Sequence, residues 1–542
     1  MHDNPETKRQ HAMVRHGVSL SILTLFSRVL GLLREMTKSA FMGTSPIADA
    51  FAVAFLIPNL LRRLFAENSI TVAFIPTFKK YIAAIGDAHT DAEKEAAHKN
   101  AGEFLSAIFT LVSFLTTVIV VLGIIFTPLI LKIFFPDKTD NFLLTVLLTR
   151  IMFPYLALIS LAAFFQGILN SVNVFTPSGF TPILFNIIII GCTYALTDFF
   201  NNSAIAMSIG VTLGGIVQAL FQLPFVLKTD FRFSFTGLKK AFTNEGTKKV
   251  VSLIVPTIFG MAAYQVNDLV ASALGKHAGP GVLSSLQYSL RLQELLLGVF
   301  AVSVGTVILP DLSGCAVKKD WKNFQQIFLT AIKTIALITI PATFFSLLSG
   351  EHIITLVYKA KSFDDNSVAL TLNAFTFHIA GLFFIALNRI IAPAFYAQGN
   401  SKQPALAGIL SFAVNIVLSF RLVSVMAGGG LALAMTIASF INTVLLFFFL
   451  RDNKNLDFKK ITTATVLNVI KICIFSIIAS LPVYFFGEYF YQMFAGYTRI
   501  ISEGVPLLIN FFIFGAIGLL LLAITGDTIF KNMLARVIKK RG

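Results

Sequence analysis

Residues 104–133, FLSAIFTLVSFLTTVIVVLGIIFTPLILKI, decide the fold class of this chain. No residue from 104 to 131 is charged, and most of them are apolar. Because about 20 apolar residues suffice for a helix to span a bilayer, this stretch predicts a transmembrane helix. The composition agrees, since 56% of the 542 residues are apolar and only 13% are charged. Soluble domains carry about 25% charged residues, which argues against a soluble enzyme.

Similar apolar stretches recur along the whole chain. We therefore predict an all-α integral membrane protein with about fourteen transmembrane helices. The predicted spans are residues 18–41, 47–78, 104–133, 142–169, 177–198, 204–227, 249–275, 282–310, 324–349, 369–397, 404–426, 429–450, 464–487 and 504–526.

The charge is distributed unevenly between the predicted loops. The net charge is +16, and most of the 43 Lys and Arg residues lie in alternate loops and in the two tails. Because basic loops stay in the cytoplasm, we predict a multi-pass protein with both termini cytoplasmic. The basic residues are scattered among short loops, so no nucleic-acid partner is expected.

Two parts of the sequence resemble one another, which indicates an internal repeat. Asn173 and Asn400 each precede a proline by four residues, and another asparagine, Asn186 or Asn415, lies in the span that follows. The alternative is that polar turns followed by proline recur by chance. A repeat with an even number of helices keeps both copies in the same membrane orientation.

The repeat predicts two six-helix bundles, an N-lobe and a C-lobe, around a central cavity, with two additional C-terminal helices. The predicted parts are a cytoplasmic N-terminus (1–17), the N-lobe (18–228), a basic cytoplasmic linker (229–248), the C-lobe (249–451), the two additional helices (452–527) and a basic cytoplasmic tail (528–542).

Nine basic residues fall inside the predicted spans and away from the span ends, where each central charge costs about 2.5–3.5 kcal/mol on insertion scales. They are Arg28, Arg34, Arg62, Arg63, Arg150, Arg291, Lys333, Arg389 and Lys471. For Lys333, Arg389 and Lys471 we favour a position near a helix end, with the charged group reaching the membrane surface. The others need a water-filled cavity or an anion.

Three helical faces combine arginine with polar groups. Ser27 and Arg34 are seven residues apart on the first span, with Lys38 on the same stripe. The second span presents Asn59, Arg62 and Arg63 together, and the eighth presents Ser284, Arg291 and Glu294. The carboxylates Asp49, Glu67 and Glu294 are too few to neutralise these arginines. Such an excess suits an anionic substrate such as a phosphate; the alternative is ion pairing for folding alone, Arg34 with Asp49 for instance.

Four sequence runs are specific enough to identify relatives. They are residues 26–31 (FSRVLG) with Arg34, 48–55 (ADAFAVAF), 58–67 (PNLLRRLFAE) and 73–76 (AFIP). These runs resemble the MurJ/MviN family of the MOP exporter superfamily. The resemblance continues through residues 153–155, 168–170, 305–310 and 392–396, so it covers the first twelve spans.

The resemblance implies a transporter, not an enzyme. Members of the family flip lipid II, the undecaprenyl-pyrophosphoryl disaccharide-pentapeptide precursor of peptidoglycan, across the bacterial inner membrane. It implies ten functional positions, which are Ser27, Arg28, Arg34, Asp49, Asn59, Arg62, Arg63, Ser284, Arg291 and Glu294. One departure is Asn68, where the family usually has glycine.

The resemblance also suggests an ion whose binding could drive transport. Some members bind sodium, and Asp268, Asn415 and Thr436 would be the ligands here, with no other cofactor expected. Those members have an acid four residues after the asparagine, and this chain has Ser419 there, so it lacks one of their sodium ligands. Membrane potential is the alternative driving force.

The expected mechanism is alternating access, with the pyrophosphate on the arginines and the polyprenyl tail in a groove made with the last two spans. Expected partners are lipid II, membrane lipids and other proteins of cell-wall synthesis. The nearest alternative is a related exporter of another lipid-linked oligosaccharide or of drugs. A membrane enzyme acting on polyprenyl phosphates would need clustered acids for a metal, and the acids here are dispersed.

Overall fold

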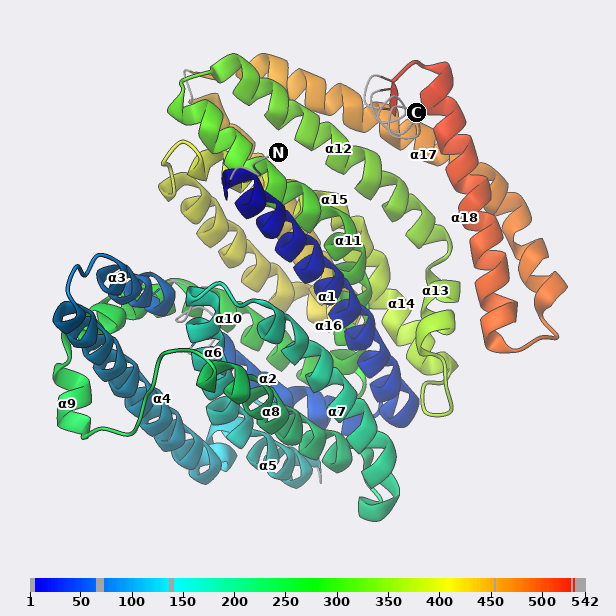
Figure 1. Ribbon diagram of the computed structural model, residues 1–542. Coiled ribbons are helices and arrows are strands. Elements are labelled where there is room, and N and C mark those ends of the chain that lie inside the picture. The colour runs from blue at the N-terminus through cyan, green and yellow to red at the C-terminus, as the bar shows by residue number, and fades with distance from the viewer. Residues whose placement is uncertain (1–4, 65–72, 136–140, 453–454, 528–529, 532–542) are drawn as a thin grey trace. The chain divides into compact units, whose positions relative to one another are not determined.

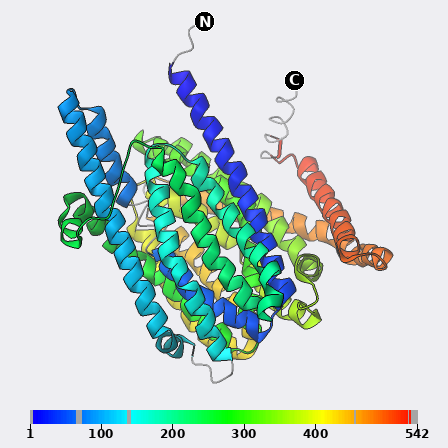
Figure 2. The ribbon, with the colours of Figure 1, turned by 60° about the horizontal axis from the view of Figure 1, so that its bottom comes forward.

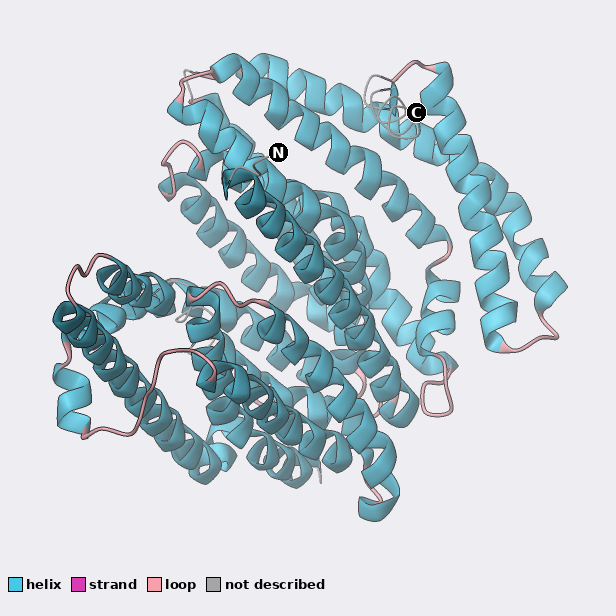
Figure 3. Ribbon diagram, in the orientation of Figure 1, coloured by secondary structure: helices cyan, strands magenta, loops and turns pink. Residues whose placement is uncertain are grey.

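The computed structural model describes residues 5–64, 73–135, 141–452, 455–527 and 530–531. The described chain is almost entirely α-helical and contains no β-strand (Figure 3). Glu67 and nearly all of the predicted basic tail, 528–542, lie outside the described residues. The prediction of an all-α fold is confirmed.

The chain divides into two compact units, Met1–Ala273 and Leu274–Gly542. The boundary falls inside a helix, so the predicted lobe limits at 18–228 and 249–451 stay a prediction. The helices that begin in the first unit are α1 (Pro5–Met42), α2 (Pro46–Arg62), α3 (Ile75–Gly86), α4 (Asp91–Phe134), α5 (Asn141–Met152), α6 (Pro154–Ser171), α7 (Thr176–Phe200), α8 (Ser203–Leu227), α9 (Leu238–Thr243) and α10 (Glu245–His277) (Figure 1).

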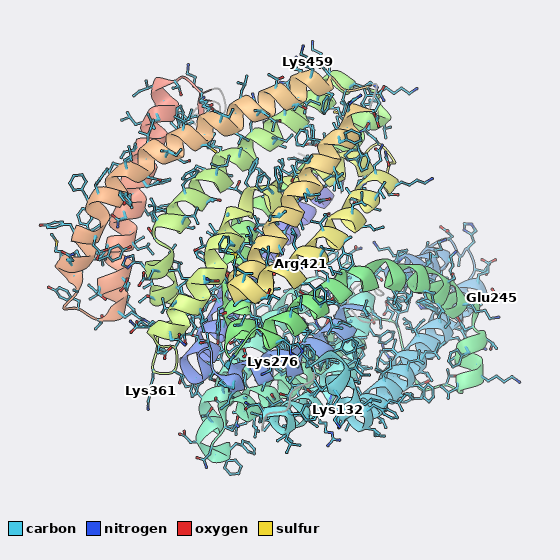
Figure 4. All side chains as sticks on the ribbon, turned by 180° about the vertical axis from the view of Figure 1, so that it is seen from behind. Lys132, Glu245, Lys276, Lys361, Arg421 and Lys459 are labelled. Atoms are coloured by element: carbon cyan, nitrogen blue, oxygen red, sulfur yellow. The ribbon has the colours of Figure 1, made fainter. Side chains whose placement is uncertain are left out.

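The second unit continues from the end of α10 to the C-terminal hairpin. Its helices are α11 (Val282–Val317), α12 (Trp321–Leu348), α13 (Gly350–Tyr358), α14 (Asp365–Ala380), α15 (Leu382–Tyr396), α16 (Lys402–Arg451), α17 (Phe458–Phe494) and α18 (Arg499–Ile524). Figure 4 shows Lys459 at one end of this unit, with Lys276 and Lys361 toward the opposite end.

Within the described residues, eight helical segments are long and apolar enough to cross a membrane, or nine when the bent pair α14–α15 counts as one span. One of the eight, α16, is two spans in a single element, because Ala427 interrupts its 50 residues with a φ of 47°. The four remaining predicted spans coincide with α1, α2–α3, α10 and α11. These are the helices that carry the predicted charged site residues, which lowers their hydropathy. The prediction of about fourteen spans agrees with this arrangement.

Local chemistry explains where the helices begin. Ser45 accepts a hydrogen bond from the N–H of Ala48 at the start of α2, and Pro46 occupies the first turn, where no backbone donor is needed. A capping box between Thr90 and Glu93 starts α4. Pro182 in α7 removes the donor for a carbonyl one turn earlier, and the Thr181 hydroxyl donates to that oxygen instead.

Each unit has its own apolar core. In the first unit Phe74, Phe78 and Phe104 stack together, and Phe164 meets Phe74 edge-on. In the second unit α11, α12, α15 and α16 bury a cluster of aliphatic and aromatic side chains. Outward faces of the long helices are apolar as well, as expected for surfaces in lipid.

The turns that suggested an internal repeat have the same backbone geometry. After α6, Asn173 adopts a left-handed φ of 62°, and the N–H of Val174 donates to the carbonyl of Leu169. After α15, Gly399 adopts a φ of 74°, and the next N–H donates to a carbonyl five residues back, as in the first turn. The structure therefore matches Asn173 with Gly399, one residue before the Asn400 that the sequence comparison paired with it.

Candidate functional site

Arg34 is held between two helices of the first unit. Its guanidinium donates to the side-chain oxygen of Asn186 in α7 at 3.2 Å and to Glu35 at 2.8 Å. The Asn186 amide in turn donates to the backbone carbonyl of Ser27, one residue before Arg28. Asn186 therefore ties two turns of α1 to α7. The alternative pairing of Arg34 with Asp49 is not the contact that the structure shows.

A buried charged group lies on the same stripe of α1. The Lys38 side chain is only 4% exposed, and its ammonium is 3.9 Å from the carboxylate of Glu35. Asp49, fully buried in the first turn of α2, also attracts this ammonium. Glu35 therefore pairs with two cations, Arg34 and Lys38.

The polar face at the end of α2 is divided between two neighbours. The Arg62 guanidinium donates to the side-chain oxygen of Asn59 at 3.1 Å, along the helix. Arg63 reaches Asp268 of α10 at 3.3 Å. Arg63 and Asp268 are 35% and 44% exposed, so this ion pair is partly open to solvent. The structure thus brings Asn59 and Arg62 together and directs Arg63 to a different helix.

Arg28 differs from the other candidate arginines. It is half-buried in α1, and it makes no hydrogen bond or ion pair with any residue that the structure describes. A guanidinium stays charged at every accessible pH and has five N–H donors. Arg28 is therefore the candidate with the largest unused capacity for an anion.

The candidate residues of the second unit lie on α11. Ser284 is fully buried and donates to the carbonyl of Gly281, within its own turn. Arg291 is 35% exposed and pairs with Glu294 of the same helix at 3.1 Å. The two residues share a stripe in the sequence, but only Arg291 presents a charge at the surface of its unit.

Sequence reasoning missed a buried polar cluster between α11 and α14. Ser289 and His378 form a hydrogen bond of 2.6 Å between the hydroxyl and Nδ1, and Gln293 donates to the backbone carbonyl of His378. All three side chains are buried. The available signal was the spacing of Ser289 and Gln293, which places both on one face of α11.

Two of the three sodium ligands that the resemblance suggests already have partners, and a sodium site stays a prediction. Asp268 is engaged by Arg63 at 3.3 Å. The Thr436 hydroxyl donates to the carbonyl of Phe377 at 2.7 Å. No cluster of three or more His, Cys, Asp or Glu side chains that could hold a metal occurs among the described residues. We derive no step from sodium.

The count of carboxylates in the sequence analysis was incomplete. Glu35 and Asp268 each pair with a candidate arginine, and neither was counted as a partner. Glu294 does pair with Arg291, as its position suggested. The excess of positive charge is therefore smaller than the sequence indicated, and among the ten candidate positions Arg28 is its clearest case in the described part of the chain.

Four further cations lie inside the predicted spans. The exposed Arg150 donates to the backbone carbonyl of Ile124 in α4 at 3.0 Å. Lys471 pairs with Asp527 at 2.6 Å and lies over the ring of Phe475, which supports a structural role near a helix end. Arg389 is exposed and Lys333 is half-buried.

The comparisons with known proteins agree with one another. A family model described as Lipid II flippase MurJ matches residues 38–500. A probable lipid II flippase MurJ of Treponema pallidum (strain Nichols) is 48% identical over 523 residues, covering 96% of this chain and 97% of that protein. A probable lipid II flippase MurJ of Vibrio cholerae serotype O1 is 32% identical over 441 residues, covering 80% and 82%.

Solved structures show the same relationship. Lipid II flippase MurJ in an inward closed conformation has a TM-score of 0.76 and 26% identity, and the match covers 95% of this chain and all of that one. An inward-facing multidrug resistance MATE family transporter of the MOP superfamily has a TM-score of 0.66 at 13% identity over 83% of this chain and 98% of that one, which shows a shared fold alone. The family is one of transporters, and the chain described here belongs to it: it is a member of the MurJ family of lipid II flippases.

Proposed function

We propose that this chain flips lipid II from the inner to the outer leaflet of the bacterial inner membrane. Family membership supports the substrate. The observation that carries the proposal is Arg28, a guanidinium on a membrane helix that no described residue pairs. A charge in that position is unfavourable unless it meets water or an anion.

The pyrophosphate of lipid II is the group that such a charge would bind. Guanidinium groups bind phosphate through paired N–H donors, and hydrogen bonds to charged groups are stronger than neutral ones. Arg34, Arg62, Arg63 and Arg291 already have acceptors, so they would exchange or share them on binding. Arg28 would supply its donors without losing a partner.

The transport cycle that we propose is alternating access. The two lobes would rock so that the bound pyrophosphate and sugars pass from one side to the other. The polyprenyl tail would remain at the apolar surface of the C-terminal hairpin. A small recess there, lined by Leu337, Ile472, Phe475, Phe514 and neighbouring apolar residues of α12, α17 and α18, supports an apolar contact.

The driving force and the orientation remain part of the proposal. Membrane potential would act on a positively charged empty site with about 2.3 kcal/mol per elementary charge per 100 mV. Both termini would be cytoplasmic, and the opposite ends marked by Lys459 and by Lys276 and Lys361 in Figure 4 agree with that orientation. Contacts with other proteins of cell-wall synthesis stay a prediction.

Two measurements separate this proposal from the alternative of another exported lipid or a drug. The full-length gene should restore growth to cells depleted of their own MurJ. Purified protein in vesicles should move labelled lipid II across the bilayer, and drugs should neither be transported nor compete. Failure to complement, together with absence of lipid II movement in vesicles that contain folded protein, would refute the proposed function.

A further inference from the structure

The segment predicted as a basic cytoplasmic linker is packed along a membrane helix. The N–H of Ser234 donates to the Ser106 hydroxyl of α4 at 3.1 Å, and the N–H of Thr236 donates to the Thr110 hydroxyl at 3.0 Å. The short helix α9 follows, and its Ala241 is buried against α4. Figures 1 and 2 both show α9 lying beside α4.

The contacts with α4 place this segment at the depth where the apolar stretch begins. That stretch starts at residue 104, and the contact at Thr110 is about 10 Å further along the helix than Glu103 at 1.5 Å per residue. The linker therefore follows α4 into the zone of lipid headgroups and upper acyl chains.

Aromatic residues alternate with polar ones in the linker, and the outermost aromatic residue is exposed. Phe231 and Phe233 pack against the core of the first unit. Phe235 lies against Phe109, with ring centroids 4.7 Å apart, yet it is 71% exposed. Phe242 of α9 is exposed too. Exposed aromatic rings at this depth are typical of surfaces that contact the membrane interface.

A basic pocket lies between α4 and this segment. Its volume is about 330 Å³, and its lining includes Lys99, Gly102, Glu103, Arg232, Phe235 and Lys240. The three cations face a single carboxylate, and Glu103 is paired with Lys240 at 3.1 Å. Gly102 allows the close approach, because a Cβ there would lie 3.3 Å from the carbonyl of Arg232. The pocket keeps a surplus of positive charge.

We propose that this pocket binds the phosphate of an anionic phospholipid from the surrounding bilayer. Lys99 and Arg232 would contact the phosphate, and the exposed rings of Phe235 and Phe242 would lie against the acyl chains. The pocket is built only from the first unit and contains none of the candidate transport residues. It is therefore a separate, peripheral site, and it does not depend on the proposed function.

The charge and the apolar surface together favour a lipid over a soluble anion. Basic residues near a membrane surface each add about 1 kcal/mol of attraction for anionic lipid, which is about fivefold in a binding constant. A soluble phosphate would gain nothing from the exposed aromatic rings, whereas a phospholipid would cover them.

The test uses a tryptophan reporter in the full-length protein. The chain contains one tryptophan, Trp321. The variant Phe235→Trp, combined with Trp321→Phe, places a single indole beside the pocket. The protein is reconstituted in phosphatidylcholine bilayers with increasing amounts of brominated phosphatidylglycerol, and quenching of the fluorescence gives the preference for the anionic lipid. We expect a preference of about fivefold or more over brominated phosphatidylcholine.

Charge removal then locates the preference. Arg232→Gln and Lys99→Gln should each reduce it severalfold, whereas Lys239→Gln, at an exposed residue outside the pocket lining, should leave it unchanged. Unchanged thermal unfolding shows that each variant is folded. An equal loss in Lys239→Gln would mean diffuse surface charge and would overturn the proposal, as would absence of any preference. Loss of the preference on adding inorganic phosphate, against sodium chloride at matched ionic strength, would assign the pocket to a soluble anion instead.

Discussion

Two candidate arginines of the first unit, Arg34 and Arg63, are held differently from Arg291 of the second unit. In the first unit Arg34 and Arg63 are bonded to other helices, through Asn186 of α7 and Asp268 of α10. In the second unit Arg291 is bonded to Glu294 of its own helix. A neutral polar contact joins α11 to α14 in the same unit, between Ser289 and His378.

This difference separates stability from transport. Removing an arginine that joins two helices removes a tertiary contact together with a charge. Removing Arg291 leaves the packing of α11 intact, because its partner lies one turn away on the same helix. Arg291 therefore allows the charge to be tested alone, whereas Arg34 and Arg63 do not.

The largest expected effect is on transport by Arg291→Ala. Loss of a charged hydrogen bond to the substrate is worth about 1.5–3 kcal/mol, so lipid II flipping in vesicles should fall at least about tenfold. Thermal unfolding in detergent should be unchanged. Arg34→Ala should lose transport and also unfold at lower temperature, because its bond to Asn186 is lost.

The matched control for these variants is Arg421→Ala, at an exposed residue outside the candidate site. It should leave both flipping and unfolding unchanged. Wild-type transport by Arg291→Ala would show that the candidate arginine of the second unit does not bind the substrate. A large drop in its unfolding temperature would contradict the contrast between the units.

The next largest effect concerns the neutral polar contact of the second unit. His378→Ala would leave the buried Ser289 hydroxyl without its hydrogen-bond partner and create a cavity, so the free energy of unfolding should fall by about 1–3 kcal/mol. Chemical unfolding in detergent measures this. Ser289→Ala in the same background should add little, since the two residues act as a pair; full additivity would contradict the assignment.

A smaller effect on stability is expected at Asp364, the residue that caps the N-terminus of α14. The N–H and hydroxyl of Ser367 both donate to Asp364, and these bonds lower the pKa of its carboxyl below 3.8. The bonds stabilise the folded state above pH 3.8, and this contribution disappears as pH falls through the lowered pKa. Asp364→Ala should cost about 1 kcal/mol of unfolding free energy at pH 7 and nothing in strong acid. A difference from wild type that is independent of pH would contradict the cap.

The smallest effect is the coupling between Arg63 and Asp268. Because both side chains are partly exposed, a double-mutant cycle with Arg63→Ala and Asp268→Ala should give about 0.5–1 kcal/mol. High salt should weaken it. A coupling energy that is far larger, or that does not change with salt, would show that the ion pair is shielded from solvent and would contradict this prediction.

The fold could be predicted from the sequence because span length and hydropathy are local properties. The run at 104–133 and the turn at Asn173 illustrate this. The arginines could be singled out for the same reason, since a charge inside an apolar stretch is visible in the sequence. Their partners could not, because the pairing of Arg34 with Asn186 depends on which faces of distant helices meet.

The packing of the linker could not be predicted from the sequence either. Its lysines and arginine predicted a cytoplasmic loop, and the alternation of Phe231, Phe233 and Phe235 was too short to indicate a packed segment. Hydroxyl groups of α4 hold it in place through its backbone N–H groups, a contact with no signature in the linker itself.

The central claim is that unpaired positive charge on a membrane helix is retained for the anionic group of the substrate, and Arg28→Ala tests it most directly. The measurement is lipid II flipping by purified protein in vesicles, alongside thermal unfolding of the same sample. Because Arg28 has no partner among the described residues, the account predicts a loss of flipping of at least about tenfold with unchanged unfolding. Wild-type flipping by Arg28→Ala would contradict the claim.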